Sequence, residues 1–249
     1  MLNKEQIQKI EKIEGYLDVD EGLLLYKLGN NLSDNNIALE VGSFKGKSTV
    51  WTASGIKNSG VKAQVVAVDH GVGDPEAGIM NTKDILMNNI EENGVSHIVK
   101  PIFMTSQEAI KNWHEPIDML FIDAAHDYYN VKEDFKWAKF LKNGGYIVFH
   151  DVLNPAEGPA RVYIEEVIKS LNFSDFGAVE SIMFARKNIS RRKRLGIQES
   201  IVMYLLYLWL FLTRVINKLP KRGFRKRVVR FTMKSCLRKI VRFFAPANV

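Results

Sequence analysis

The chain has 249 residues, a net charge of +7 and a single cysteine, Cys236, which excludes an internal disulfide and suits one domain with an appendage. Residues 187–249 hold 17 Lys and Arg residues and one acid, whereas the first 186 residues hold 18 basic and 27 acidic residues. An acidic body with a basic tail predicts a small-molecule site in the body and attachment of the tail to an anionic surface. Residues 1–14 are charged and helical in pattern, unlike a secretory signal peptide.

Two helices are predicted within residues 1–36, ahead of the first strand. Apolar residues recur every three or four positions between Ile7 and Leu17, a spacing typical of an amphipathic helix. A second helix is expected over residues 23–28, because the acids of residues 18–22 suit a helix N-terminus.

The stretch that organises the chain is residues 37–49. Residues 37–41 are predicted to form a buried parallel strand, which runs into a turn containing Gly42 and Gly46 and then into a helix beginning at Ser48. The first amides of that helix would point back at the turn. Glu40 is expected to be paired or to face a ligand, because burying a lone carboxylate is costly.

Three ligand-binding interpretations of this turn compete. A P-loop needs four residues between its first glycine and the Gly-Lys-Ser/Thr, whereas Gly42 and Gly46 enclose three. A dinucleotide-binding G-x-G-x-x-G turn would need a glycine in place of Phe44. The pattern acid-x-Gly-x-x-x-Gly, followed by a second acid after the next strand, fits Glu40 and Asp69. A tight strand-to-helix turn without a ligand is the remaining alternative.

Further polar residues follow the second and third predicted strands. Asp69 ends the second strand, where a carboxylate can accept hydrogen bonds from ribose hydroxyls, although a turn or cap role is the alternative. Residues 82–92 are predicted as a helix and residues 99–104 as the third strand. Ser106 or Gln107 then offers an adenine contact, which a plain helix N-cap explains equally well.

Two successive strands are predicted to end in an acid and a histidine. Asp123 ends the fourth strand and His126 follows it, while the fifth strand, residues 146–149, ends in His150 and Asp151. The carboxyl ends of parallel strands meet at the edge where open α/β sheets bind ligands. Two carboxylates and two imidazoles therefore come to one rim, which favours a functional site over a structural histidine.

The other elements complete an α/β fold with a doubly wound, mostly parallel seven-stranded sheet in residues 1–189. They are a helix over residues 131–141 capped by Gly144-Gly145, a helix over residues 160–171, and a closing pair of strands over residues 173–179 and 181–185.

From about Ile10 to Lys187 the order of motifs resembles the class I S-adenosylmethionine (SAM)-dependent methyltransferases, which are Rossmann-like, and in particular methyltransferase family 24. That branch is found among sugar, glycan and small-molecule O-methyltransferases. The matching pieces are Glu14-Gly15-Tyr16-Leu17, Asp20-Glu21-Gly22, Glu40-Val41-Gly42-Ser43, Gly46-Lys47-Ser48-Thr49, Val68-Asp69, Gly73-Asp74, Ile122-Asp123, His126, Tyr128, Gly144-Gly145 and Phe149-His150-Asp151. The resemblance implies SAM as methyl donor, in a pocket formed by Glu40, Gly42, Ser43, Gly46, Ser48, Asp69, His70, Ser106 and Asp123.

The resemblance leaves the acceptor and the metal open. Related metal-dependent O-methyltransferases hold a divalent cation at the ends of strands four and five, where Asp123, His150 and Asp151 stand, with His150 in the place of a second acid. These three residues are the expected ligands of a cation such as Mg²⁺; without a cation, His126 or His150 is the expected base, with Asp123 beside it in the catalytic group. Residues 122–125 lack the Asn/Asp-Pro-Pro-aromatic motif of nucleic-acid amino-methyltransferases, which counts against a nucleobase acceptor.

The tail, residues 190–249, is predicted to be helical and cationic. Residues 201–212 carry no charge, but a membrane span needs about 20 apolar residues. Residues 224–244 have a basic and an apolar-aromatic stripe, which indicates an interfacial membrane anchor. The alternatives are a helical pair that docks on the body or dimerises, and a nucleic-acid-binding tail, whose apolar stripe would stay exposed.

The sequence thus predicts a SAM-dependent O-methyltransferase that acts on a saccharide or lipid-linked glycan hydroxyl. It is expected on the cytoplasmic face of a bacterial-type membrane, with residues 198–244 against the anionic surface, and a homo-oligomer is left open. One alternative is a catalytically inactive methyltransferase fold that binds a membrane or partner, supported only by His150 in the place of an acid. Another is an RNA methyltransferase that uses the basic tail, which predicts salt-sensitive RNA binding.

Overall fold

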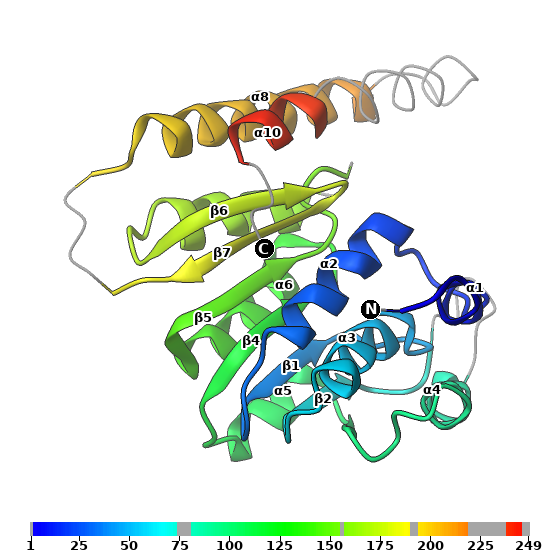
Figure 1. Ribbon diagram of the computed structural model, residues 1–249. Coiled ribbons are helices and arrows are strands. Elements are labelled where there is room, and N and C mark those ends of the chain that lie inside the picture. The colour runs from blue at the N-terminus through cyan, green and yellow to red at the C-terminus, as the bar shows by residue number, and fades with distance from the viewer. Residues whose placement is uncertain (1, 74–80, 155–156, 190–193, 219–237, 246–249) are drawn as a thin grey trace.

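The computed structural model describes residues 2–73, 81–154, 157–189, 194–218 and 238–245. One seven-stranded sheet runs through the body in the order β3-β2-β1-β4-β5-β7-β6 (Figure 1). The strands are β1 (Ile37–Val41), β2 (Gln64–Asp69), β3 (Val99–Phe103), β4 (Ile117–Ile122), β5 (Leu141–Phe149), β6 (Phe173–Val179) and β7 (Ile182–Lys187). The first five are parallel, while β7 pairs antiparallel with both β5 and β6. The predicted fold class is confirmed.

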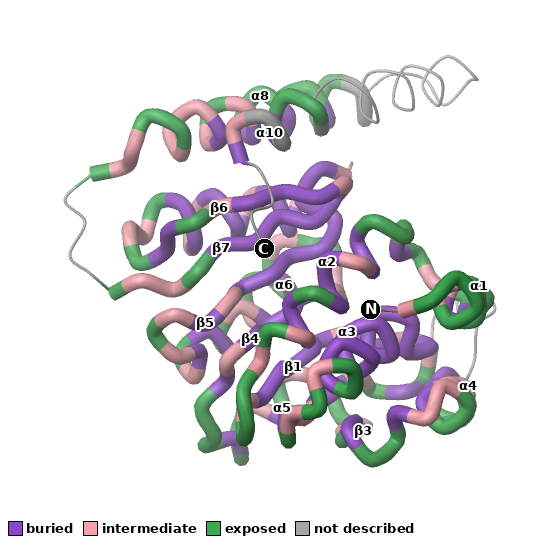
Figure 2. Tube along the Cα trace, in the orientation of Figure 1, coloured by how far each residue is buried: buried purple, intermediate pink, exposed green. Residues whose placement is uncertain are grey.

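Helices cover both faces of the sheet (Figure 1). They are α1 (Lys4–Glu11), α2 (Val19–Asn30), α3 (Lys47–Ser59), α4 (Thr82–Glu92), α5 (Ser106–Ala109), α6 (Tyr128–Asp134), α7 (Glu157–Val162), α8 (Ile197–Lys218) and α10 (Arg238–Phe244). Alternate residues of one strand enter different cores: Val66 and Val68 join one apolar cluster, and Val65 and Ala67 join the other. The strands are therefore apolar on both faces, as parallel strands covered by helices must be (Figure 2).

The predicted helix over residues 131–141 was wrong in its second half. Helix α6 ends at Asp134, a 3₁₀ helix follows over Phe135–Lys139, and Leu141 already begins β5. The glycines Gly144 and Gly145 lie inside that strand and do not cap a helix. A Cβ on Gly145 would stand 2.7 Å from the backbone oxygen of Asp118, so the glycine allows β4 and β5 to approach at an irregular register.

The N-terminal helix is shorter than its apolar spacing indicates. Helix α1 begins with a capping box between Asn3 and Gln6 and ends at Glu11. Ile13 and Leu17, in the segment after the helix, are nevertheless buried in the core that α2 and α3 also enter. The apolar spacing therefore predicted correctly that Ile13 and Leu17 are buried. It was wrong about where the helix ends.

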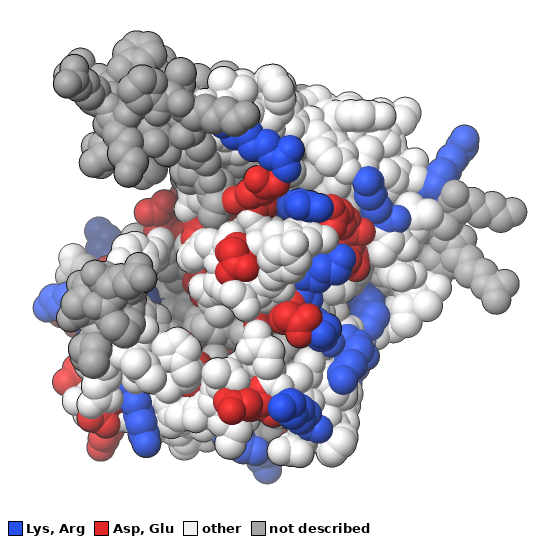
Figure 3. Space-filling view, turned by 180° about the vertical axis from the view of Figure 1, so that it is seen from behind, with Lys and Arg blue, Asp and Glu red and all other residues white. Residues whose placement is uncertain are grey.

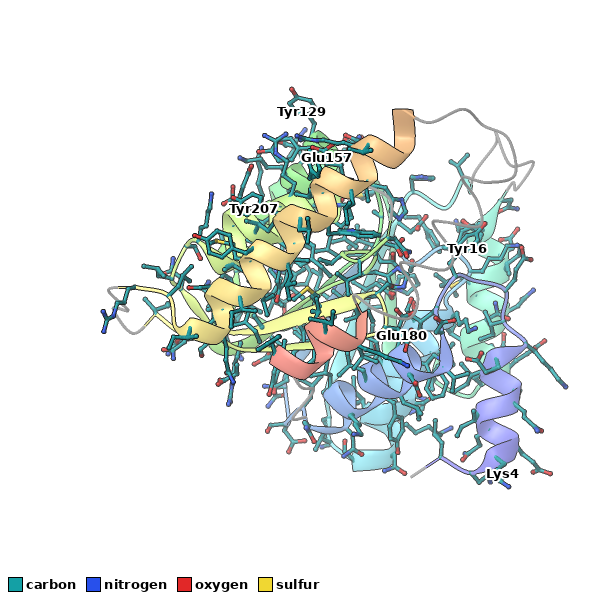
Figure 4. The ribbon with its side chains drawn as sticks, turned by 90° about the horizontal axis from the view of Figure 1, so that it is seen from above. Lys4, Tyr16, Tyr129, Glu157, Glu180 and Tyr207 are labelled. Atoms are coloured by element: carbon teal, nitrogen blue, oxygen red, sulfur yellow. The ribbon has the colours of Figure 1, made fainter. Side chains whose placement is uncertain are left out.

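Helix α8 packs on the body with one of its two apolar faces. Val202, Leu206 and Trp209 are buried in the same apolar cluster as the sheet and α7. Arg214 of α8 also forms an ion pair with Glu157 of α7, and Figure 4 shows Glu157 beside α8. The division of the chain at residue 189 stays a prediction.

Of the predicted basic helix over residues 224–244, the structure describes the last third, residues 238–244. Helix α10 packs on β6 and α8, and the backbone N–H of Ala178 donates to the oxygen of Ala245 at 2.9 Å. Three predicted features lie outside the described residues. They are the tail boundary at residues 190–193, the motif residue Asp74, and most of the basic stripe, including Arg227, Arg230 and Lys234. None of the helices in the described part of the chain is both long and apolar enough to span a membrane.

Trp209→Ala tests the docking of α8. Trp209 is 2% exposed whereas Phe211, two residues later, is 62% exposed. Replacing a buried Trp by Ala costs about 3–5 kcal/mol, so Trp209→Ala should lower the urea midpoint strongly. Phe211→Ala is the matched control and should change stability by less than about 1 kcal/mol. Equal effects of the two substitutions in urea unfolding would contradict the packing of α8 on the body.

Candidate active site

A cavity of about 870 Å³ opens at the carboxyl ends of the parallel strands. Its wall is built from the segments that follow β1, β2, β3, β4 and β5 in turn, and residues 14–17 form its outer side. A cavity of this volume can hold a ligand as large as a nucleoside that carries an additional substituent. The position is the one at which open α/β sheets bind ligands.

The turn after β1 brings its backbone unusually close to that of β4. Gly42 has φ 90°, and a Cβ there would stand 2.5 Å from the backbone oxygen of Asp123. Phe44 also has a positive φ, 47°, and its N–H donates to a carboxylate oxygen of Asp69 at 2.9 Å. The Ser43 hydroxyl is buried and has no hydrogen-bond partner among the described residues. Because Gly42 has no side chain, it leaves room for a ligand beside the backbone. The unpaired Ser43 hydroxyl offers that ligand a hydrogen-bonding atom.

The Glu40 carboxylate is buried behind this turn. It accepts hydrogen bonds from the hydroxyls of Ser48 and Thr49, at the start of α3. Burial raises the pKa of Glu40 to about 7 against these two hydrogen bonds. Glu40 therefore ties the strand to the helix across the glycine turn.

Most of the predicted SAM-pocket residues line the cavity. Glu40 and Gly46 do not; those that do are Gly42, Ser43, Ser48, Asp69, His70, Ser106 and Asp123. Asp69 accepts from the backbone N–H groups of Phe44 and Gly71, the latter at 2.7 Å. Each of its oxygens keeps a second lone pair for a ligand hydroxyl. The ligand roles of these residues stay predictions.

The far end of the cavity contains a buried acid that the sequence reasoning missed. Asp134 is buried, and burial raises its pKa to about 6 even though Ser106 hydrogen-bonds to it. The Ser106 hydroxyl also accepts a hydrogen bond from Trp137 at 2.9 Å. A capping box between Thr105 and Glu108 begins α5, as the N-cap alternative predicts. Asp134 could have been found because it lies three residues after the inward-facing Val131.

The four predicted rim residues come together, and a fifth, Glu21, joins them. His150 is 4% exposed; its Nδ1 lies 3.0 Å from Asp123 and 3.3 Å from Asp151, and its Nε2 lies 3.2 Å from Glu21. Burial alone would lower the pKa of His150, but the three surrounding carboxylates raise it well above its ordinary value. Sequence reasoning missed Glu21 as a site residue, because the acids of residues 18–22 also suit a helix N-terminus.

The second histidine lies on the outer side of the same cluster. His126 is 51% exposed in its side chain, and its Nε2 lies 2.6 Å from Asp151. The hydrogen bond to Asp151 raises the pKa of His126. Asp151 has φ 59° and also accepts from Asn154. Burial would raise the pKa of Asp151, but the nearby His126 and His150 rings hold it well below the ordinary range. Asp151 is thus an ionised acceptor between two imidazoles.

The donor set of this cluster fits a divalent cation. Asp123, His150 and Asp151 each offer one ligand atom, and these atoms all lie within 4.8 Å of one another. The Nδ1 atom of His150 is buried and makes no hydrogen bond within the described residues. Two carboxylates and an imidazole are common ligands of divalent metals.

A comparison with known protein families identifies the type of domain that contains this cavity. Residues 39–152 match a family model described as a methyltransferase domain, family 24, and these residues hold the glycine turn, Asp69 and the rim residues Asp123, His126, His150 and Asp151. Residues 39–152 thus carry a methyltransferase domain. The match agrees with the predicted family, and SAM and SAH are the ligands of two structural neighbours described next.

Solved structures share the fold of this methyltransferase domain. The O-methyltransferase from Bacillus cereus in complex with SAH is 24% identical, covers 75% of this chain and 93% of its own, and has a TM-score of 0.54. The O-methyltransferase TomG from Streptomyces achromogenes in complex with SAM is 19% identical, with 75% and 91% covered and a TM-score of 0.55. A methyltransferase from Geobacter sulfurreducens is 15% identical, with 75% and 89% covered and a TM-score of 0.55.

Glu40→Gln tests the buried acid behind the glycine turn. Glu40 has a folded pKa of about 7 against an ordinary value of 4.5, so the folded state holds the extra proton between these pH values. Stability of the wild type should therefore fall as pH rises from about 4.5 to 7, by at most about 1.4 kcal/mol per pH unit. The Gln variant lacks this loss, so it should equal the wild type at pH 4.5 and exceed it at pH 8. Thermal unfolding without SAM at both pH values checks this; a difference between the proteins that does not change with pH would contradict it.

Proposed function

We propose that the protein transfers the methyl group of SAM to a hydroxyl of a saccharide, free or lipid-linked, next to an anionic membrane surface. The observation that carries the reaction type is the His126–Asp151 pair at the open side of the SAM cavity. SAM supplies a methyl group that is already activated. What remains for the protein is to hold the acceptor oxygen in line and to remove its proton.

His126 is the residue placed to take that proton. Because Asp151 is ionised and can only accept, the proton of the 2.6 Å hydrogen bond belongs to Nε2 of His126. Nδ1 is then the nitrogen that can accept a proton from a hydroxyl. His150 is less suited, because it is buried and both of its nitrogens face carboxylates. We therefore assign the base to His126, with Asp151 fixing its tautomer.

Asp123, His150 and Asp151 would hold a divalent cation, and a bound cation would lower the pKa of an acceptor hydroxyl. The acceptor itself would enter past residues 14–17. Tyr16 is among the most exposed aromatic side chains of the described residues, it lines the cavity and its ring stacks on Phe44 with centroids 6.3 Å apart. Figure 4 shows Tyr16 at the periphery of the body. Such a ring offers a flat apolar face to the C–H side of a sugar, which supports a saccharide acceptor.

The outward face of α8 supports the membrane location. Five of its exposed apolar residues lie on one helical stripe: Tyr204, Leu208, Phe211, Leu212 and Val215. Figure 3 shows a largely uncharged surface over α8. An apolar stripe next to a cationic segment is typical of helices that lie in a membrane interface. We propose that this outward face of α8, within the predicted range of residues 198–244, makes the membrane contact.

His126→Gln separates chemistry from cofactor binding. Without the base, kcat for methyl transfer from labelled SAM to a membrane glycan extract should fall by about 100-fold or more, while the Kd for SAM stays unchanged. Asp69→Asn should do the reverse and weaken SAM binding by about 10-fold or more, because it loses charged hydrogen bonds. Calorimetry and product counting measure the two quantities. Wild-type transfer to RNA but not to the glycan extract would overturn the acceptor class, and an active His126→Gln variant would overturn the base.

The pair Leu208→Ser and Phe211→Ser tests the membrane contact in the full chain. Each substitution removes an exposed apolar side chain without touching the buried face of α8. Cosedimentation with phosphatidylglycerol vesicles should weaken by about 10-fold or more, given roughly 1.5 kcal/mol or more for each large apolar side chain that enters the interface. The matched control, Val19→Ser with Met87→Ser, changes exposed residues of α2 and α4. Equal loss in the control, or a wild type that leaves the vesicles unbound, would contradict the proposal.

A further inference from the structure

The buried side of His150 is held by an acid from the opposite end of the chain. Glu21 is buried, and its Oε1 accepts from the backbone N–H of Ser181 at 2.8 Å and from the Ser181 hydroxyl at 2.6 Å. Its Oε2 accepts from the backbone N–H of Asp18 at 2.9 Å and faces Nε2 of His150 at 3.2 Å. These three donors hold both oxygens of Glu21 in place, so the carboxylate cannot turn away from His150.

This arrangement fixes which nitrogen of His150 is available. Because Glu21 already accepts from three N–H and O–H donors, we place the hydrogen between Glu21 and His150 on Nε2. Nδ1 then points to the other side of the ring, toward Asp123 and Asp151. Their oxygens lie at 3.0 and 3.3 Å, and a cation bound there would take the place of a proton on Nδ1. A buried nitrogen aimed between two carboxylate oxygens is the geometry of a ligand for a cation.

The distances agree with a common ion between the three donors. Two ligands at right angles around an ion with bonds of about 2.1 Å stand about 3 Å apart. A histidine ligand whose other nitrogen donates to a carboxylate is a recurrent arrangement at metal sites, where the carboxylate fixes the ring and its tautomer. Glu21 occupies the place of that carboxylate.

We propose that Glu21 is a positioning residue that holds His150 as a nitrogen ligand, and that the Asp123–His150–Asp151 site consequently prefers a first-row transition ion such as Mn²⁺ to Mg²⁺. Carboxylates accept both ions, but an imidazole ligand favours the transition metal, since Mg²⁺ prefers oxygen donors. The inference rests on the proposed function only for the role of the bound cation in methyl transfer. Cation binding itself is independent of methyl transfer.

The experiment measures cation binding directly in the full chain. Free Mn²⁺ is followed by its electron paramagnetic resonance signal as protein is added, and Mg²⁺ is then titrated as competitor. The wild type should bind one Mn²⁺ per chain at least about 10-fold more tightly than Mg²⁺. His150→Asp leaves only oxygen donors and should reduce this preference to less than about threefold. Glu21→Gln should weaken Mn²⁺ binding by about 10- to 100-fold.

The matched control for Glu21→Gln is Asp20→Asn, which removes a carboxylate from the exposed neighbouring position of the same helix and should leave Mn²⁺ affinity unchanged. Thermal unfolding shows whether each variant folds; should Glu21→Gln fail to fold, Ser181→Ala removes one hydrogen bond from Glu21 and should give a smaller loss in the same direction. Absence of Mn²⁺ binding, equal affinity for Mg²⁺, or a folded Glu21→Gln variant with wild-type affinity would each overturn the inference. Failure of methyl transfer in a protein that binds Mn²⁺ as described would overturn the proposed function instead.

Discussion

The rest of the site depends on the burial of charge at the carboxyl ends of the parallel strands. Three carboxylates, Glu21, Asp123 and Asp151, surround one buried imidazole, His150. Ionised groups removed from water are tolerated only when hydrogen bonds and opposite charges replace the water. Each acid of this cluster has such partners from a different part of the chain. The elements that meet here are therefore held to one arrangement, and the cavity keeps its shape beside them.

The strands and the glycine turn could be predicted because their signals are local. An apolar run followed by Gly42 and a helix is visible in a dozen residues, and so is the acid or histidine at the ends of β2, β4 and β5. The parallel topology then brings Asp123, His126, His150 and Asp151 to one edge without further information. The fold class and four members of the rim thus follow from the sequence.

The parts that could not be predicted depend on distant partners or on packing. Glu21 meets His150 across 129 positions of sequence, and its own surroundings describe an ordinary helix start. Leu141 continues the helical spacing of Phe135 and Ala138 but is taken by strand β5, because pairing with β4 outweighs local spacing. Helix α8 has apolar residues on both of its faces. Its composition therefore predicts contact with the body or with a membrane, but does not identify the face that packs on the body.

Because Ser181 is synthesised long after Glu21, the charge cluster can be completed only late in the synthesis of the chain. Ser181 lies between β6 and β7 and donates twice to Glu21, which leaves the ribosome 160 residues earlier. At a synthesis rate of about 5–20 residues per second this interval lasts about 10 to 30 seconds. During that interval α2 can form, but of its partners Glu21 has only the local backbone N–H of Asp18 until His150 and Ser181 follow. The final hairpin also supplies residues to both apolar clusters, among them Met183 and Phe184. A chain that ended before residue 181 would lack both hydrogen bonds that Ser181 donates to Glu21, and with them the clamp that holds His150 in place.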